Sequence, residues 1–509
     1  MYALLVVVYF WRFRYLQYDD SYITYRYARN LAEGQGLVFN AGERTNSASS
    51  FLYTVSLAVL SLIPVLSIPS WGITIGVVSI ALTISASLFL AARLRVPAIA
   101  SLVALVPLLI YPEISYWSFS GMETALFIAA MSAFLALFLA QSGVRQIPVW
   151  TLAVSGSIAV LTRPEAILII APALLAEAVL AKRDGSWSRF ICIAGSTIAS
   201  AAALFIFYWA YYGHISSDAL AYKRIYPYYQ QTVVQGLEGL TAFALEHVWL
   251  FTVSLFGLIV GMALMSRSSE RLVRAWSLPG SILIASLLTV IGPRADYSRY
   301  HFMLLTAPLV IAATWGFGET LKALRAVSAK GERWRVARSL GLGAVGIWIL
   351  ALAVDMPPRF SGFVTSVTPG LEIQSARIDA GRHLEEQSGP RGTVLSGDLG
   401  AIAFYNPSNK YLDQGLVTPS VVDSIEDGGD VVQPIASVRP EFIADTSDGR
   451  SPGTVALVLE KPADYYGPKA AAGCPFEELA KVQPIRFFPS GEYGVFVGRL
   501  SWVREKCPD

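Results

Sequence analysis

Residues 190–212 read FICIAGSTIASAAALFIFYWAYY, a run without a charged side chain. A bilayer core of about 30 Å requires roughly 20 such residues in a helix, so this stretch predicts a transmembrane span. Comparable apolar stretches recur at 50–68, 71–92, 97–111, 122–141, 147–161, 166–181, 247–265, 276–292, 300–318 and 338–355. The sequence therefore predicts a polytopic α-helical membrane protein with about eleven transmembrane helices.

The apolar stretch at residues 2–16 is shorter than the others. Arg12 and Arg14 within it must snorkel to the interface or face protein. A removable signal peptide is the alternative, although no small-residue cleavage site follows. If residues 2–16 cross the bilayer, one of the next apolar segments does not. Segment 50–68, which two prolines interrupt, is the candidate for a half-inserted helix.

Composition and charge divide the chain into two parts. The chain is 54% hydrophobic and 15% charged, whereas soluble proteins carry roughly 25% charge. Its net charge of +2 hides an asymmetry, because residues 356–509 hold 20 acids and 14 bases while residues 1–355 hold 17 acids and 25 bases. We expect a membrane domain at 1–355 and an α/β domain at 356–509, and nothing favours a nucleic-acid partner.

The orientation follows from the positions of Lys and Arg, which collect on the cytoplasmic side of membrane proteins. Basic clusters lie in the loops at 182–189, 267–274 and 322–338. Alternation of the helices then predicts that other segments face outward, namely 111–124, 162–165, 213–246, 293–299 and everything after residue 355. The predicted location is the cell membrane, with the α/β domain outside.

The acidic tail alternates strand-like runs with turn residues, as an α/β domain does. The runs are Thr393–Leu395, Thr454–Glu460 and Tyr493–Leu500, and an amphipathic helix is expected near 371–387. An oxidising exterior favours a disulfide between Cys474 and Cys507. Cys192 lies in an apolar helix and is expected to serve packing, and three cysteines are too few for a cysteine zinc site.

The first outward loop carries two adjacent carboxylates, Asp19 and Asp20. They suit a general base or ligands to a divalent cation such as Mg²⁺ or Mn²⁺. The alternative is an N-terminal cap in which Asp20 or Ser21 starts a surface helix. Spacing alone favours neither interpretation.

Four further outward segments carry charged side chains at helix boundaries. Glu123 is a lone carboxylate for which a cap is again the alternative, and Arg163 with Glu165 forms either part of a functional cavity or a structural clamp. The remaining candidates are Lys223, Asp296, Arg299 and His301. Arg and Lys at the membrane boundary suit a lipid-linked phosphate. An interfacial aromatic belt accounts for most neighbouring Tyr and Trp residues.

The outward motifs together resemble a known superfamily. They run from Asp-Asp-Ser-Tyr-Ile-Thr-Tyr-Arg at 19–26, through Ser-Gly-Met-Glu-Thr at 120–124, Leu-Thr-Arg-Pro-Glu at 161–165 and Tyr-Tyr-Gly-His at 211–214, to Asp296 with Arg299. Ser-Gly-Asp-Leu-Gly at 396–400 and Asp413 to Leu416 fit more loosely. The pattern is similar to the GT-C superfamily of polyprenyl-phosphate-sugar glycosyltransferases, and most of all to its bacterial terminal arabinofuranosyltransferase-like branch.

The resemblance implies transfer of a hexose or pentose, with inversion, from a polyprenyl phosphate to a glycan acceptor on the outer face. Arabinofuranose or mannose is the expected sugar, and a metal cofactor is left open. The implied site consists of Asp19 or Asp20 as the catalytic base, Glu123, Tyr22 and Arg26 as orienting residues, Arg163, Lys223 and Arg299 for the donor phosphate, and Asp296, His301 and Glu165 as support. Ile215 to Asp218 depart from the pattern, which leaves the donor contacts there open.

Two other classes compete with a glycosyltransferase. A transporter or lipid-linked-sugar flippase requires ionisable residues near the middle of the bilayer and an inverted repeat, and the sequence shows no repeat. A sensor anchored by its helices leaves the charged loops unexplained. The α/β domain is expected to bind carbohydrate near the acceptor or to act as a lid.

Overall fold

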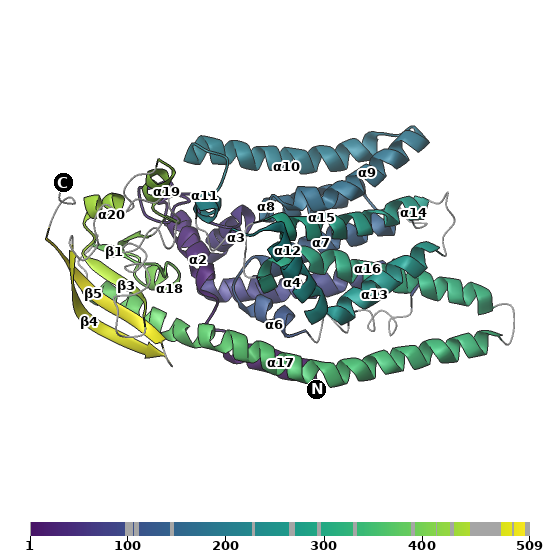
Figure 1. Cartoon of the computed structure of the whole chain (residues 1–509). Coiled ribbons are helices and arrows are strands. Elements are labelled where there is room, and N and C mark those ends of the chain that lie inside the picture. Colours follow the sequence, from purple (N-terminus) through teal and green to yellow (C-terminus); the bar gives the residue numbers. More distant parts are fainter. Residues whose placement is uncertain are drawn as a thin grey trace.

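The computed structural model describes residues 2–96, 105, 111–142, 147–225, 230–263, 270–292, 297–328, 333–387, 392–413, 415–427, 432–447, 480–490 and 493–503. The first helices are α1 (Tyr2–Arg12), α2 (Asp19–Ala32), α3 (Phe51–Ser61), α4 (Ile68–Arg93), α6 (Pro112–Phe119), α7 (Thr124–Leu139), α8 (Val149–Thr162), α9 (Ala166–Asp184) and α10 (Ser188–Tyr212), with a 3₁₀ turn at Ala140–Ser142. Those that follow are α11 (Asp218–Ile225), α12 (Val233–Glu246), α13 (Val248–Ala263), α14 (Glu270–Ala275), α15 (Ser277–Ile291), α16 (Tyr297–Ser328) and α17 (Arg333–Gln387). Together α1 to α16 form a helical body, and a sheet domain lies at its end (Figure 1).

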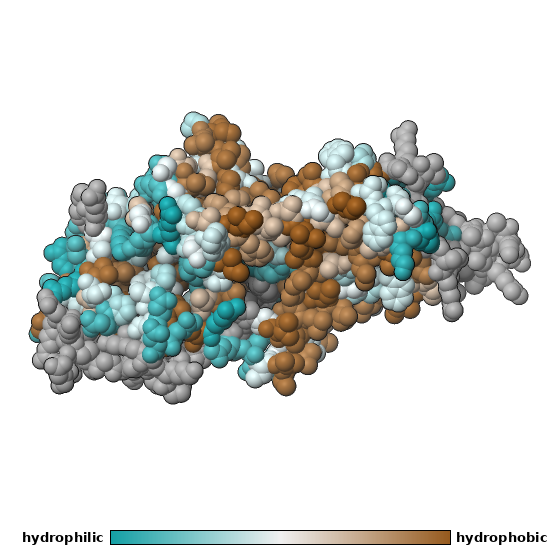
Figure 2. Space-filling view, turned by 90° about the horizontal axis from the view of Figure 1, so that it is seen from above, coloured by the Kyte–Doolittle hydropathy of each residue, from teal (hydrophilic) through white to brown (hydrophobic). Residues whose placement is uncertain are grey.

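Four described helices are long and apolar enough to cross a membrane, which makes the protein multi-pass. They are Ile68–Arg93, Ser188–Tyr212, Glu270–Ile291 and His301–Lys322. Two bent pairs, α6 with α7 and α12 with α13, bring the number to six among the described residues if each pair counts as one span. Apolar side chains cover much of the helical body, while hydrophilic ones gather at the sheet domain (Figure 2). Helix α3 has only 11 residues, fewer than a span needs. The expected number of about eleven spans stays a prediction.

Helix α17 connects the helical body to the sheet domain without a break. It has 55 residues, and Pro357, Pro358 and Pro369 lie inside it. Proline removes a backbone donor and kinks a helix, and Figure 1 shows α17 bending along its length. The expected span at 338–355 and the expected amphipathic helix at 371–387 are thus two parts of one helix, and the domain boundary expected at residue 355 falls inside it.

In its described residues the sheet domain has a mixed five-stranded sheet and three short helices, as expected for an α/β domain. Its elements are β1 (Thr393–Leu395), α18 (Ala401–Phe404), β2 (Lys410–Leu412), α19 (Pro419–Glu426), α20 (Gln433–Val438), β3 (Phe442–Ser447), β4 (Ala480–Ser490) and β5 (Tyr493–Trp502). The strand order is β2-β1-β3-β5-β4, in which β1 is parallel to β2 and β3, and β5 is antiparallel to β3 and β4. The predicted strand at 454–460 and both Cys474 and Cys507 lie outside the described residues. Cys192 is a free cysteine on α10.

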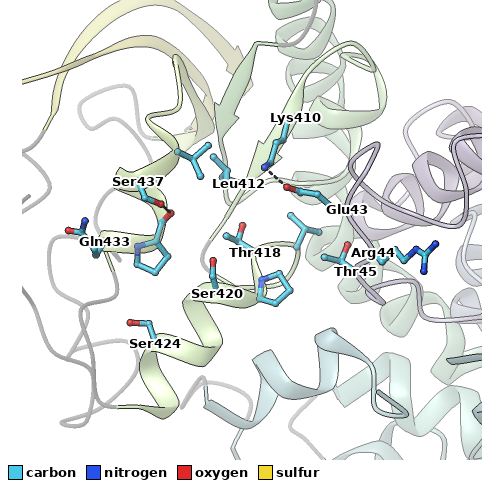
Figure 3. A pocket seen from close by; sticks show the side chains of 14 residues that line it. Glu43, Arg44, Thr45, Lys410, Leu412, Thr418, Ser420, Ser424, Gln433 and Ser437 are labelled. Carbon is cyan, nitrogen blue, oxygen red and sulfur yellow. Dashed lines mark hydrogen bonds and ion pairs between the residues drawn. The ribbon is translucent and has the colours of Figure 1, made fainter. Parts of the chain in front are cut away.

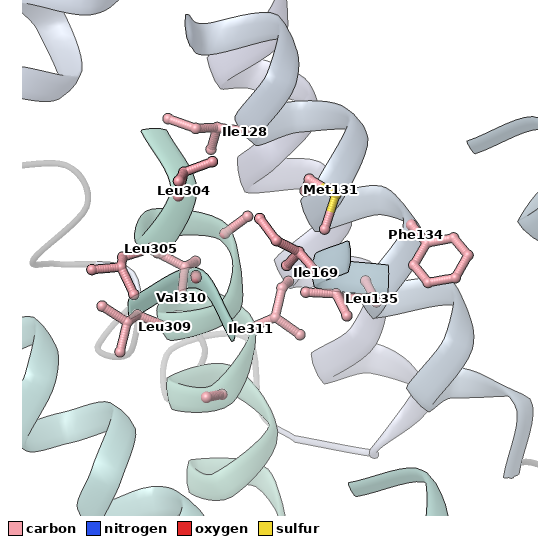
Figure 4. Packing of buried hydrophobic residues seen from close by; sticks show 14 of the residues in the cluster. Ile128, Met131, Phe134, Leu135, Ile169, Leu304, Leu305, Leu309, Val310 and Ile311 are labelled. Atoms are coloured by element: carbon pink, nitrogen blue, oxygen red, sulfur yellow. The ribbon is translucent and has the colours of Figure 1, made fainter. Parts of the chain in front are cut away.

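The core of the helical body lies where α7, α9 and α16 meet (Figure 4). The packed side chains include Ile128, Met131, Phe134 and Leu135 from α7, Ile169 from α9, and Leu304, Leu305, Leu309, Val310 and Ile311 from α16. Small residues bring other helices into backbone contact, as is common between membrane helices. A Cβ atom on Gly316 of α16 would overlap the backbone of Gly257 on α13.

Replacing Gly316 by Ala is expected to destabilise the helical body, because neither backbone at this crossing can move without repacking. Overpacking of this kind costs about 1–3 kcal/mol. Thermal unfolding in detergent should show a lower Tm for Gly316→Ala. Gly195→Ala on α10 is the matched control, because a Cβ there meets nothing within 4 Å. Equal Tm values for both variants and the wild type contradict the close packing.

Candidate active site

Asp19 and Asp20 are the first two residues of α2, directly after the chain leaves α1. The N-cap of α2 is Tyr18, and no side chain caps the helix, so neither Asp20 nor Ser21 is the N-cap that the alternative interpretation requires. The Tyr18 backbone N–H donates to the Ser120 carbonyl at 3.1 Å, which fixes the start of α2 against the segment after α6. Both carboxylates are therefore presented at the junction of the helical body and the sheet domain.

The Asp19 carboxylate is held by groups that follow it by more than 350 residues. Its Oδ1 accepts hydrogen bonds from Gln374 Nε2 at 2.9 Å and from the Ala401 backbone N–H at 3.0 Å. Arg377 Nε lies 3.9 Å from the same oxygen. Gly400 packs directly on Asp19, because a Cβ there would overlap its backbone oxygen and carboxylate. Asp19 therefore joins α2 to α17 and α18.

Arg377 is the cationic centre of this junction. Its Nη2 binds Asp398 Oδ1 at 2.9 Å, and Nη1 donates to Gln374 Oε1 at 3.2 Å. Asp398 Oδ2 in turn accepts from the Thr446 backbone N–H at 2.7 Å. Charge-assisted bonds of this kind fix side-chain geometry. Arg377 and Asp398 thus hold Asp19 in place from the sheet-domain side.

Burial and charge move the pKa values at this junction in opposite directions. Burial raises the pKa of Asp19 above 3.8, Arg377 opposes that rise, and Asp398 adds to it. Burial lowers the pKa of Arg377, but the negative charges of Asp398 and Asp19 raise it by more, so the pKa of Arg377 lies above its usual value. Asp19 is consequently a stronger proton acceptor when ionised than an exposed aspartate.

A cavity of about 410 Å³ opens beside Asp19 and Asp20. It lies between α2, α6, α11, α17 and two loops of the sheet domain. The lining residues are Tyr18, Asp19, Asp20, Ile23, Tyr116, Tyr222, Ser366, Val367, Gly370, Leu371, Arg377, Gly397, Asp398, Leu399, Asp413 and Leu416. The volume is in the range of small-molecule sites. Among these lining residues Arg377 is the one cation, facing four aspartates.

Tyr22 and Arg26, predicted to orient a substrate, lie behind this cavity and do not line it. Tyr22 is buried, with its ring 5.6 Å from that of Phe404. Arg26 is buried as well and donates to the Phe39 carbonyl at 2.9 Å and to the Asn409 carbonyl at 2.6 Å. Burial lowers the pKa of Arg26 to about 10. Their contacts attach α2 to the sheet domain.

Glu123, Arg163 and Glu165 come together as an ion-paired cluster away from the cavity lining. Arg163 Nη1 lies 2.6 Å from Glu123 Oε1, and Nη2 lies 2.9 Å from Glu165 Oε1. Gly121, with φ +77°, makes the turn before Glu123, and its carbonyl accepts from the Tyr53 hydroxyl at 2.6 Å. Arg163 therefore pairs with two carboxylates, as the clamp interpretation expects, and its role toward a phosphate stays a prediction.

The other predicted residues are placed only in part. Lys223 lies on α11 next to Tyr222, which lines the cavity. His301 is buried on α16, and its ring stacks on Phe243 at 5.5 Å. The side chain of Arg299 and all of Asp296 lie outside the described residues. Convergence of Arg163, Lys223 and Arg299 on one phosphate therefore stays a prediction.

Sequence reasoning missed Gln374 and Arg377 as site residues. They are three positions apart on α17, one face of a helix, but nothing local marks their partners. Asp398, Gly400 and Asp413 were included in the resemblance without a role. Within the described parts of the chain, no group of three His, Cys, Asp or Glu side chains is arranged to hold a metal. Metal dependence stays open.

The fold and the cavity define a multi-pass membrane protein with a polar chamber between its helices and a sheet domain. Solved structures of ArnT from Cupriavidus metallidurans share this fold. One, bound to undecaprenyl phosphate, has a TM-score of 0.57 and 13% identity, and the match covers 100% of this chain and 98% of that chain. The apo structure has a TM-score of 0.56 and 13% identity, and the match covers 98% of this chain and 97% of that chain. No family model and no curated protein match the chain.

Gly400→Ala is expected to disrupt the junction, because the added methyl group occupies the space of the Asp19 carboxylate. The Tm in detergent should fall by an amount equivalent to about 1–3 kcal/mol. Gly362→Ala on α17 is the control, since a Cβ there meets nothing within 4 Å. If Gly400→Ala has the same Tm as the wild type, Gly400 does not pack directly on Asp19.

Proposed function

We propose that this protein is an inverting glycosyltransferase that transfers one sugar from a polyprenyl phosphate to a hydroxyl of a glycan acceptor on the outer face of the membrane. The motifs of its outward loops resemble the GT-C superfamily, and it shares the fold of ArnT, which has been solved with undecaprenyl phosphate bound. The observation that carries the proposal is the Asp19 carboxylate, held by Gln374 and Arg377 at the edge of a polar cavity.

Asp19 is proposed as the general base. Asp20 also lines the cavity but is exposed to solvent, whereas Asp19 is largely buried and its pKa is raised. A carboxylate of raised pKa takes a hydroxyl proton more readily, and placement of such a base contributes about 10²–10⁴-fold to a rate. The rigid partners of Asp19 keep one oxygen occupied and orient the other.

The reaction is a single displacement. The acceptor oxygen bonds to the anomeric carbon while its proton passes to Asp19. The bond between the anomeric carbon and the phosphate oxygen breaks on the opposite face, and its electron pair leaves with the lipid phosphate. Attack opposite the leaving group inverts the anomeric centre. Stabilising the charge of the departing phosphate is the other requirement of catalysis.

The proposed phosphate ligands remain Lys223, Arg299 and Arg163. Their surroundings favour Lys223 over Arg163. Lys223 is favoured because it follows Tyr222, a cavity residue. Arg163 is already paired with two carboxylates, so a phosphate must compete with Glu123 and Glu165 for its donors. Arabinofuranose or mannose is the proposed sugar, by resemblance alone. The flippase alternative predicts lipid-linked sugar movement without transfer.

Asp19→Asn is expected to lower sugar transfer by about 10²–10⁴-fold, because it removes the proton acceptor while keeping the hydrogen-bonding shape. Transfer is measured with purified protein in liposomes and polyprenyl-phosphate arabinose or mannose as the donor. Asp184→Asn, an exposed aspartate at the end of α9, is the control and should retain the wild-type rate. If folded Asp19→Asn and Asp20→Asn each transfer at the wild-type rate, the proposed chemistry is wrong.

Arg377→Gln is expected to shift the acidic limb of the pH profile of kcat/KM to higher pH. The base must be ionised, so the rate falls as the pH drops through the pKa of Asp19. Arg377 lowers that pKa, and its removal lets the pKa rise. Arg382→Gln, an exposed arginine on the same helix, should leave the limb in place. If the acidic limb of Arg377→Gln stays in place or moves to lower pH, Asp19 is not the base.

A further inference from the structure

A second cavity, of about 720 Å³, lies on the sheet domain (Figure 3). It is formed by the loop after α2, by β2, and by α19 and α20, segments that are far apart in the sequence. Its lining consists of Glu43, Arg44, Thr45, Lys410, Leu412, Val417, Thr418, Pro419, Ser420, Ser424, Gln433, Pro434, Ser437 and Val438. Ligand sites commonly have this volume. We call it the hydroxyl groove.

The groove offers the two kinds of surface that a sugar chain presents to a protein. Ser420, Gln433 and Thr418 contribute hydroxyl and amide groups to the lining, and apolar side chains such as Leu412 contribute the larger share of its surface. Sugar rings carry hydroxyls at their edges and C–H groups on their faces. Uncharged donors and acceptors satisfy hydroxyls without the desolvation cost of a buried ion.

The charged side chains of the groove do not favour a strongly ionic ligand. Glu43 and Lys410 form an ion pair with each other across its rim, as Figure 3 shows. Arg44 is exposed, and its guanidinium stacks over the ring of Tyr211, 4.8 Å from the centroid. A polyanion would have to break the first pair. The lining therefore matches a neutral, hydroxyl-rich chain.

The groove and the active-site cavity share a wall. Leu412, Val417 and Thr418 line the groove, whereas Asp413 and Leu416 line the active-site cavity. Asp413 makes this wall firm, because its carboxylate accepts from the backbone N–H groups of Leu416 at 2.7 Å and Val417 at 2.9 Å. A ligand bound in the groove therefore lies next to the active-site cavity.

We infer that the hydroxyl groove binds the acceptor glycan, holding the sugars that precede the residue whose hydroxyl is glycosylated. This inference rests on the proposed function, since an acceptor exists only if sugar is transferred. The shared wall places sugars held in the groove next to the cavity that Asp19 lines. The groove thereby selects for a long acceptor over a single sugar.

The test measures binding separately from turnover. Full-length protein in nanodiscs is titrated with octyl-linked oligo-arabinofuranosides and oligo-mannosides, and with octyl glycosides of single sugars. Ser420→Trp places a bulky ring in the groove from an exposed position on α19. It should weaken oligosaccharide binding at least about tenfold, or 1.4 kcal/mol, and raise KM for the long acceptor alone. Gln433→Ala, a milder change, should act in the same direction.

Asp423→Trp is the matched control, because Asp423 is exposed on the same helix and does not line the groove. It should bind and react like the wild type. The groove assignment is overturned if the wild type does not bind the oligosaccharides. It is also overturned if Ser420→Trp binds them as tightly as the wild type does. Groove-dependent binding without any transfer by the wild type instead overturns the proposed function and leaves the groove standing.

Discussion

A buried guanidinium joins the two parts of this molecule. Arg26, in the middle of α2, donates to carbonyl groups of the loop after α18 as well as to Phe39 beside it. A buried cation is costly unless its donors are satisfied, so the helix and the loop are stable here only together. Arg29 lies three residues after Arg26 on the same helix and makes a similar contact, because it donates to the Phe404 carbonyl at 2.6 Å. The sheet domain is accordingly part of the site's scaffold.

This constraint determines what Asp19 can do. Because α2 is fixed along its length, its first residue meets Gln374 and Ala401 in a single geometry. Arg377 and Asp398 then adjust the charge at that point from the opposite side. The site is therefore assembled from the start of α2, the C-terminal part of α17 and the turn before α18. No one of these segments contains it.

The sequence could predict the local features of the site but not its long-range partners. Adjacent carboxylates after an apolar run marked Asp19 and Asp20, and strand-like runs between turn residues marked β1 and β5. Arg163 pairs with Glu123, which lies 40 residues before it in the sequence. Because the sequence does not show this pairing, it allowed Arg163 to be either a phosphate ligand or part of a clamp. Helix α17 was divided in two because the apolar stretch ends at residue 355 and the acidic tail begins there, whereas the helix continues through this change of composition.

The distance in sequence between the partners of Asp19 has a consequence for biosynthesis. Gln374 follows Asp19 by 355 residues and Ala401 by 382. At about 5–20 residues per second, ribosomes need roughly 20–75 s to synthesise that interval. During this time α2 is already made while its carboxylate has no partner from α17 or α18. Truncated chains therefore lack this junction, which can form only after the first part of the sheet domain has been synthesised.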